Sequence, residues 1–116
     1  MSEMVEVRAI VRIEMLDRVV RCLKEAGVPR LTVSRVHAIG AGVDPKFEKF
    51  SFDEGSAYAD KAQVQFICDV RSSLDFVELV ARTARTGRHG DGIVSVQPVS
   101  CVTKVRTGVS GVEALR

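Results

Sequence analysis

The sequence lacks a long apolar run, an excess of charge and a secretory signal, and each absence excludes a class of protein. No run approaches the roughly 18 consecutive apolar residues that a membrane-spanning helix needs. The formal net charge is only +2, so no overall field draws the chain to nucleic acid or to a membrane surface. Residues 1–6 show no basic and apolar signal-peptide pattern, which predicts a cytoplasmic protein.

The cysteines are also few. Cys22, Cys68 and Cys101 are odd in number and widely spaced, no CxxC pair exists, and both histidines lie far from them in the sequence. Free cysteine is among the residues most often buried, so these three are expected to act as small apolar groups in a reducing compartment. We therefore expect no metal site.

What is present is the apolar pattern of one small α+β domain over residues 1–116. Alternation of apolar and polar residues, or runs of β-branched ones, predicts five strands. Apolar residues at helical spacing predict helices over 16–26 and 74–84. The strands are expected over 5–13, 31–36, 62–70, 93–96 and, as a short C-terminal addition, 101–105.

This order, βαββαβ with one extra strand, predicts a ferredoxin-like fold, in which an antiparallel sheet carries both helices on one face. Ile10 and Ile67 nevertheless place apolar side chains on the other face. We therefore expect other copies of the chain to cover that face in a homo-oligomer.

Between residues 37 and 60 no periodicity holds, and loops this long are usually functional or disordered. Most of the aromatic residues of the chain gather in it. Two interpretations remain open: the aromatic side chains pack against the body of the loop, or they dock on a partner protein. They are Phe47, Phe50, Phe52 and Tyr58.

The stretch 83–92 holds three glycines, two arginines, a histidine and an aspartate directly after the second helix. A second basic cluster follows at Lys104 and Arg106. Glycines let a backbone approach a ligand closely, and basic side chains favour an anion, so this stretch predicts a phosphate-binding loop.

No arrangement of residues predicts catalysis. His89 is the only histidine near the glycine-rich loop, and no cysteine or serine stands in a nucleophile motif. Asp91 is most simply explained as a turn-forming residue between glycines. Because the aromatic cluster is interleaved with acidic residues rather than with a basic stripe, nucleic-acid binding is not expected either. We predict a binding protein, not an enzyme.

Over about residues 4–108 the chain resembles the PII signal-transduction family. Residues 82–92 resemble the B-loop signature of that family, 31–40 resemble the segment that leads into its T-loop, and 105–108 resemble the start of its C-loop. The T-loop then spans about 38–60, the B-loop about 83–92 and the C-terminal loop about 105–116.

The resemblance implies a homotrimer that binds an adenine nucleotide (ATP, ADP or AMP) between subunits. It also implies that the T-loop regulates a target protein in nitrogen or carbon metabolism, such as a transporter, an enzyme or a regulator. A transporter as target would recruit the trimer to a membrane protein. Lys61 matches a lysine near the anionic end of a small effector. The resemblance assigns nucleotide contacts to Gly40, Thr86, Gly87, Arg88, Gly90, Asp91, Gly92, Lys104 and Arg106.

Three positions depart from the family pattern. Ile93 replaces a lysine and Lys104 an arginine, so one phosphate cation is absent and a bidentate donor is lost. This favours ADP or AMP over ATP. Gly42 replaces a glutamine that ligates magnesium, and glycine has no side-chain oxygen, which argues against the magnesium and 2-oxoglutarate site of the family. Two alternatives stay open: a trimer that has lost nucleotide binding, or one that senses another small anion such as bicarbonate.

Overall fold

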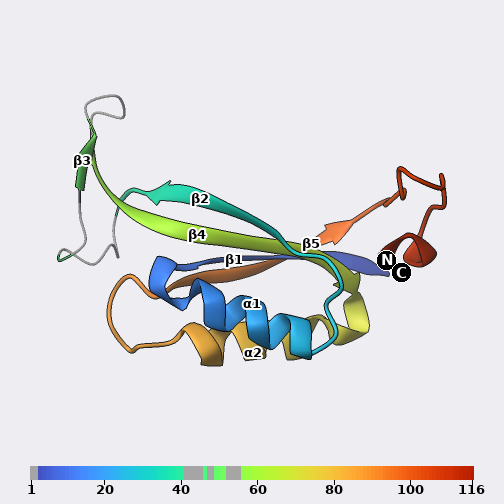
Figure 1. Ribbon diagram of the computed structural model, residues 1–116, viewed down its shortest axis with the longest axis horizontal. Coiled ribbons are helices and arrows are strands. Elements are labelled where there is room, and N and C mark those ends of the chain that lie inside the picture. The colour runs from blue at the N-terminus through green and yellow to red at the C-terminus, as the bar shows by residue number, and fades with distance from the viewer. Residues whose placement is uncertain (1–2, 41–45, 47–48, 52–55) are drawn as a thin grey trace.

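A computed structural model describes residues 3–40, 46, 49–51 and 56–116 (Figure 1). The described residues contain two α-helices and five strands, together with short 3₁₀ helices. These are β1 (Met4–Arg12), η1 (Ile13–Met15), α1 (Leu16–Glu25), β2 (Thr32–Ala38), β3 (Lys49–Ser51), β4 (Ser56–Asp69), α2 (Val70–Ala84), β5 (Gly92–Val99) and η3 (Val112–Leu115).

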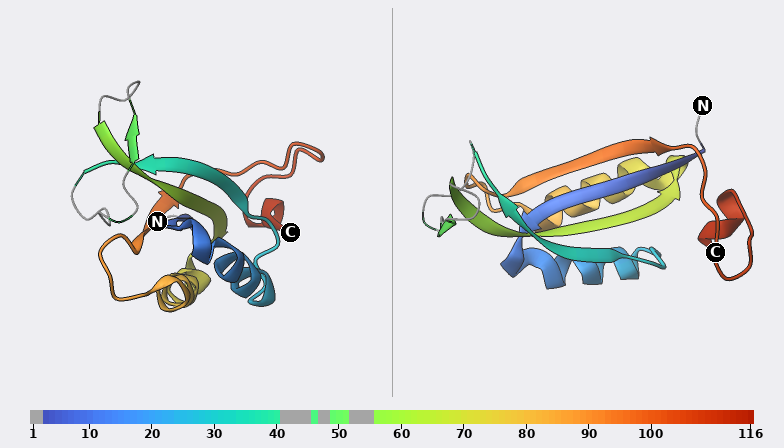
Figure 2. Two further views of the ribbon diagram at one scale, coloured as in Figure 1. Left: turned by 60° about the vertical axis from the view of Figure 1, so that its left-hand side comes forward. Right: turned by 90° about the horizontal axis from the view of Figure 1, so that it is seen from above.

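The sheet runs in the order β2-β4-β1-β5, and every neighbouring pair is antiparallel. Both helices lie on one face of it, as the two views in Figure 2 show. This is the α+β, ferredoxin-like arrangement predicted from the order of the elements. The central strands are β1 and β4, and β2 and β5 form the edges.

The core lies between the sheet and the two helices. Val7 of β1 pairs with Phe66 of β4 and Val96 of β5, so alternate residues of these strands face the helices together. The largest side chains that are almost completely buried come from both layers, and those on the strands account for the alternation seen in the sequence. They are Val7, Val11, Val19, Leu23, Val64 and Val80.

Helix α2 begins four residues before the predicted start. The carboxylate of Asp69 accepts a hydrogen bond from the Arg71 backbone N–H at 2.9 Å, so Asp69 is the N-cap and Val70 is the first helical residue. The helices of the described residues have 10 and 15 residues, and none of them is long and apolar enough to cross a bilayer.

Paired strands extend into the range predicted for the T-loop. His37 and Ala38 still belong to β2 and pair with Asp60 and Ala59, and β3 pairs with β4 beyond them. These strands project past the helices (Figure 1), so their side chains need no apolar alternation, and the sequence pattern does not show them. Residues 41–45, 47–48 and 52–55 of the predicted loop, with Phe47 and Phe52, lie outside the described residues.

The segment 101–105, predicted as a short additional strand, does not pair with the β2-β4-β1-β5 sheet. Its pairing is one isolated bridge between Thr103 and Ser110. Lys104 donates its backbone N–H to the Val109 carbonyl at 2.8 Å, so the backbone of this segment pairs with its own continuation. The chain then ends in η3, where Ala114 is only 1% exposed.

The face of the sheet opposite the helices is partly apolar, as predicted. Ile10 pairs in register with Ile93, whose side chain is 67% exposed, while Ile67 pairs with Glu6. An exposed apolar pair of this kind fits a contact between copies of the chain, and that contact stays a prediction.

Candidate functional site

The glycine-rich loop between α2 and β5 is organised around one carboxylate. The side chain of Asp91 accepts hydrogen bonds from the backbone N–H groups of Thr86 at 2.8 Å and Gly87 at 2.9 Å, and from the Thr86 hydroxyl. Arg12 completes the set, with its Nε atom 3.0 Å from Asp91 Oδ1. Burial alone would raise the pKa of the Asp91 carboxyl, but these hydrogen bonds outweigh it and hold the pKa well below its ordinary value.

Two buried basic side chains of the sheet, Arg12 and Lys61, donate hydrogen bonds to the glycine-rich loop. Arg12 at the end of β1 is 2% exposed, and Lys61 of β4, its partner in register, is 5% exposed. Arg12 donates to the carbonyl oxygen of His89 at 2.7 Å, and Lys61 donates to that of Gly90. The last carbonyl groups of the loop thus point toward the sheet, and the conformation of the loop is set by side chains from β1 and β4.

Arg12 is the residue of this candidate site that the sequence pattern missed. It stands on the same face of its strand as Arg8, with Ile10 between them, and nothing local distinguishes the two arginines. The register of the sheet distinguishes them: Val11 pairs with Gly92, so Arg12 lies beside the glycine-rich loop. A basic residue at the end of a strand points to a role in this loop only when the strand order of the sheet is known.

Gly92 has a structural requirement of its own. Its φ angle is +105°, and a Cβ atom placed there would lie 1.7 Å from the carbonyl oxygen of Ile10. The close approach that demands glycine at this position is therefore that of β1 to β5, rather than only that of a phosphate.

The structure brings several of the predicted site residues together. A depression of about 430 Å³ is lined by Lys61, the 88–93 loop and Ala38 at the end of β2. Gly40, with a φ angle of +114°, follows two residues after Ala38. Of the residues predicted to bind ligand, the depression is lined by Lys61, Arg88, Gly90, Asp91 and Gly92.

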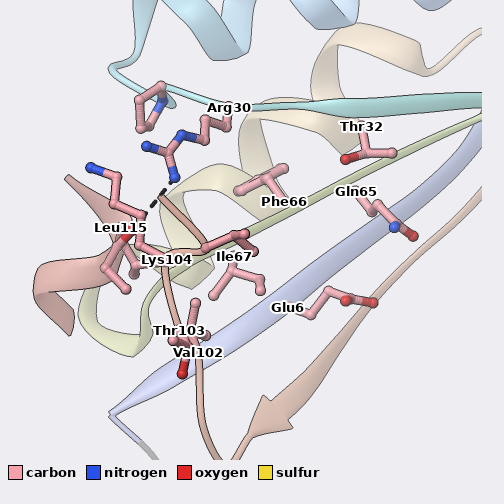
Figure 3. Close-up of a pocket in the computed structure, with 13 residues that line it drawn as sticks. Glu6, Arg30, Thr32, Gln65, Phe66, Ile67, Val102, Thr103, Lys104 and Leu115 are labelled. Carbon is pink, nitrogen blue, oxygen red and sulfur yellow. Dashed lines mark hydrogen bonds between the residues drawn. The ribbon is translucent and has the colours of Figure 1, made fainter. Parts of the chain in front are cut away.

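Lys104 and Arg106 are not part of this depression. They lie on the C-terminal segment, at the end of the sheet opposite to the 85–91 loop (Figure 1). Lys104 lines a second cavity of about 320 Å³, together with Arg30, Thr32 and Gln65 (Figure 3). Arg106 is exposed. A ligand that contacts both the loop and Lys104 would therefore have to lie between two subunits.

A polar cluster stands at the base of the β3–β4 arm. Asp60 pairs with Lys49, Nζ to Oδ2 at 2.8 Å, and its other oxygen lies 3.4 Å from His37 Nε2. The Lys49 hydrogen bond lowers the pKa of Asp60 below its ordinary value. The His37 ring stacks on Tyr58 with centroids 4.0 Å apart, so Tyr58, at least, packs locally.

Within the described part of the chain, no group of three or more His, Cys, Asp or Glu side chains is placed to hold a metal ion. Gly42, the position that bears on magnesium, lies outside it.

The family model of the nitrogen regulatory protein P-II matches residues 4–109. The chain belongs to the P-II family. The P-II protein of Nostoc punctiforme is 33% identical over 113 residues, which cover 97% of this chain and all of that protein. The P-II 1 protein of Methanothermobacter thermautotrophicus is 31% identical over 115 residues, with 99% and 100% covered.

Solved structures agree. The crystal structure of Arabidopsis thaliana PII bound to citrate has a TM-score of 0.78 and 30% identity, and the match covers 97% of this chain and 92% of that one. The resemblance inferred from the B-loop, the T-loop approach and the C-loop is thus confirmed. Members of the family are signal-transduction regulators, so this P-II protein is a regulator of that class.

Proposed function

We propose that this P-II protein is a homotrimeric sensor that binds an adenine nucleotide between neighbouring subunits and regulates a partner protein through its T-loop. The observation that carries the proposal is the 85–91 loop, which Asp91, Arg12 and Lys61 hold in a fixed conformation beside a depression. A preorganised glycine-rich loop can receive phosphate oxygens without the entropic cost of ordering a mobile one.

The nucleotide contacts of the loop come from Thr86, Gly87, Arg88, Gly90 and Gly92, with Gly40 at its border. Asp91 acts indirectly, because its carboxylate is already occupied by the loop and by Arg12. Lys104 and Arg106 reach the same nucleotide from the neighbouring subunit.

Isothermal titration of the protein with ATP, ADP and AMP tests this function. We expect ADP or AMP to bind more tightly than ATP, because Ile93 stands where a cation would neutralise the additional phosphate. Tighter binding of ATP with magnesium and 2-oxoglutarate would contradict that preference. No binding of any of the three would favour the alternative of a protein-interaction trimer that has lost its nucleotide.

A second candidate is a small anionic effector near Lys61, such as bicarbonate or a polycarboxylate. Lys61 lines the depression, and the similar Arabidopsis protein is bound to citrate. Titrating bicarbonate and citrate into the ADP-saturated protein tests it, with chloride at equal ionic strength as the control. Heat or a thermal shift beyond that of chloride supports the effector, and an equal response excludes it.

The partner is a transporter, an enzyme or another regulator of nitrogen or carbon metabolism. Recovery of partners on immobilised protein, with and without ADP, tests the regulatory role. A partner that is held equally in both conditions would contradict control by nucleotide.

A further inference from the structure

Two basic side chains meet at the cavity that lies at the far end of the sheet from the glycine-rich loop. Arg30, in the connection between α1 and β2, and Lys104, in the C-terminal segment, both line it. Figure 3 shows Arg30 and Lys104 on the same side of the cavity, with Glu6 at the other side. The carboxylate of Glu6 is paired with Arg8 at 3.1 Å, which offsets its charge. The end of the cavity near Arg30 and Lys104 is therefore electropositive.

Both cations contact the last turn of the chain. Arg30 Nη1 donates to the carbonyl oxygen of Ala114 at 3.5 Å, and Lys104 Nζ donates to that of Arg116. The Ala114 carbonyl stands at the end of η3, where backbone oxygens have no partner within the helix and carry a partial negative charge. The turn thus offers oxygen acceptors to Arg30 and Lys104, as the oxygens of a bound anion would.

The turn is fixed where it lies. Gly111 donates its N–H to the Val102 carbonyl at 3.0 Å, and Ala114 donates to Gly111 at 2.9 Å. The Ala114 side chain is 1% exposed. The contact of Arg30 is weaker than this frame, because 3.5 Å is at the outer limit of a hydrogen bond and the Ala114 carbonyl is a neutral acceptor. A phosphate oxygen would form a shorter, charge-assisted bond with Arg30.

We propose that Arg30 and Lys104 form an anion-binding pair that residues 112–116 occupy in the free protein and that a nucleotide phosphate takes over. The proposal rests on the proposed nucleotide function and adds two things to it. Arg30, which is outside the set predicted from the sequence, becomes a ligand contact and supplies a cation to a site that has Ile93 in place of a lysine. The last turn becomes an internal competitor whose release accompanies binding.

The role of Arg30 is tested by titrating ADP into the full-length chain and its Arg30→Gln variant. The matched control is Arg18→Gln, which removes one exposed arginine from α1. We expect Arg30→Gln to weaken ADP binding about tenfold, the size of one charge-assisted hydrogen bond, and Arg18→Gln to leave it unchanged. Equal affinities for the two variants and the wild type would overturn the inference and leave the proposed function standing. A wild-type protein that binds neither ADP nor ATP would overturn both.

The competitor role has its own measurement. Ala114→Leu places a larger side chain where no space exists, displaces the turn and should tighten ADP binding about threefold, as for the loss of one weak hydrogen bond. The matched control is Ala26→Leu, the same change at an exposed position after α1, which should bind ADP as the wild type does.

Hydrogen exchange on the wild-type protein keeps the competitor test independent of how that variant folds. The amides of Gly111, Ala114 and Arg116 should exchange faster when the protein is saturated with ADP. Unchanged exchange of these amides upon saturation with ADP would show that the turn is only structural.

Discussion

At the scale of single residues, Asp91 has the most concentrated set of contacts in the candidate site. Its carboxylate accepts hydrogen bonds from two backbone N–H groups, one hydroxyl group and a buried arginine. The same residue type in a Gly-Asp-Gly turn is expected on turn chemistry alone, but its contact with Arg12 spans 79 positions of the chain. Asp91 therefore links the loop to the sheet.

We expect Asp91→Asn to destabilise the fold by about 1–3 kcal/mol, because the charged acceptor is lost and buried Arg12 keeps its charge. Urea denaturation measures this, with the exposed Asp75→Asn on α2 as the matched control. The folded pKa of Asp91 lies below its unfolded value, so its stabilisation is complete above about pH 4 and is lost as the pH falls further. Asp91→Asn should therefore flatten the acid limb of the stability profile, and an unchanged limb would contradict this account.

Gly92 offers a second measurement at the residue scale. In Gly92→Ala the new methyl group would lie 1.7 Å from the Ile10 carbonyl oxygen, so β1 and β5 would have to separate. Gly108→Ala is the control, because its φ angle of +75° imposes a similar conformational strain while nothing lies within 4 Å of a Cβ there. We expect Gly108→Ala to cost about 1 kcal/mol and Gly92→Ala to cost about 2 kcal/mol more. Equal melting temperatures of the two variants would contradict the steric explanation.

At the scale of elements, the side-chain pattern predicts structure only where an element covers the core. β1 alternates because one face meets the helices, and α1 and α2 show their apolar stripes for the same reason. β4 is longer than predicted, because its first residues pair with β2 and β3 through backbone groups, which side-chain periodicity does not report. The C-terminal hairpin, likewise, is defined by backbone hydrogen bonds that side-chain periodicity does not report.

The β3–β4 arm carries an ionic cluster around Asp60, which pairs with Lys49 of β3. We expect Asp60→Asn to speed hydrogen exchange of the β3 amides, because Lys49 and His37 lose their anionic partner. The melting temperature should change little, since exposed ion pairs contribute weakly to global stability. Asp75→Asn again serves as the control, and a fall in melting temperature without faster exchange in β3 would contradict this picture.

At the scale of the whole molecule, the residues of the candidate site stand at opposite ends of the sheet within one chain. The glycine-rich loop and Lys61 stand at one end of the sheet, and Lys104 stands at the other (Figure 1). Sequence resemblance implied a site between subunits, but which of its residues stand at which end of the sheet follows only from the antiparallel topology. The division makes an inter-subunit site a necessary part of the proposed function.

Mixed oligomers test that division. Arg88→Gln damages the loop half of the site and Lys104→Gln the other half, so each variant alone should bind ADP weakly at every interface. When the two are unfolded and refolded together, some interfaces receive the intact loop from one subunit and the intact Lys104 from its neighbour. Titration of the mixture should therefore show a fraction of sites with wild-type affinity, in particles of three times the 12.7 kDa of one chain. If every site lay within one chain, mixing could not restore any of them, and the titration of the mixture would be the sum of the two weak ones.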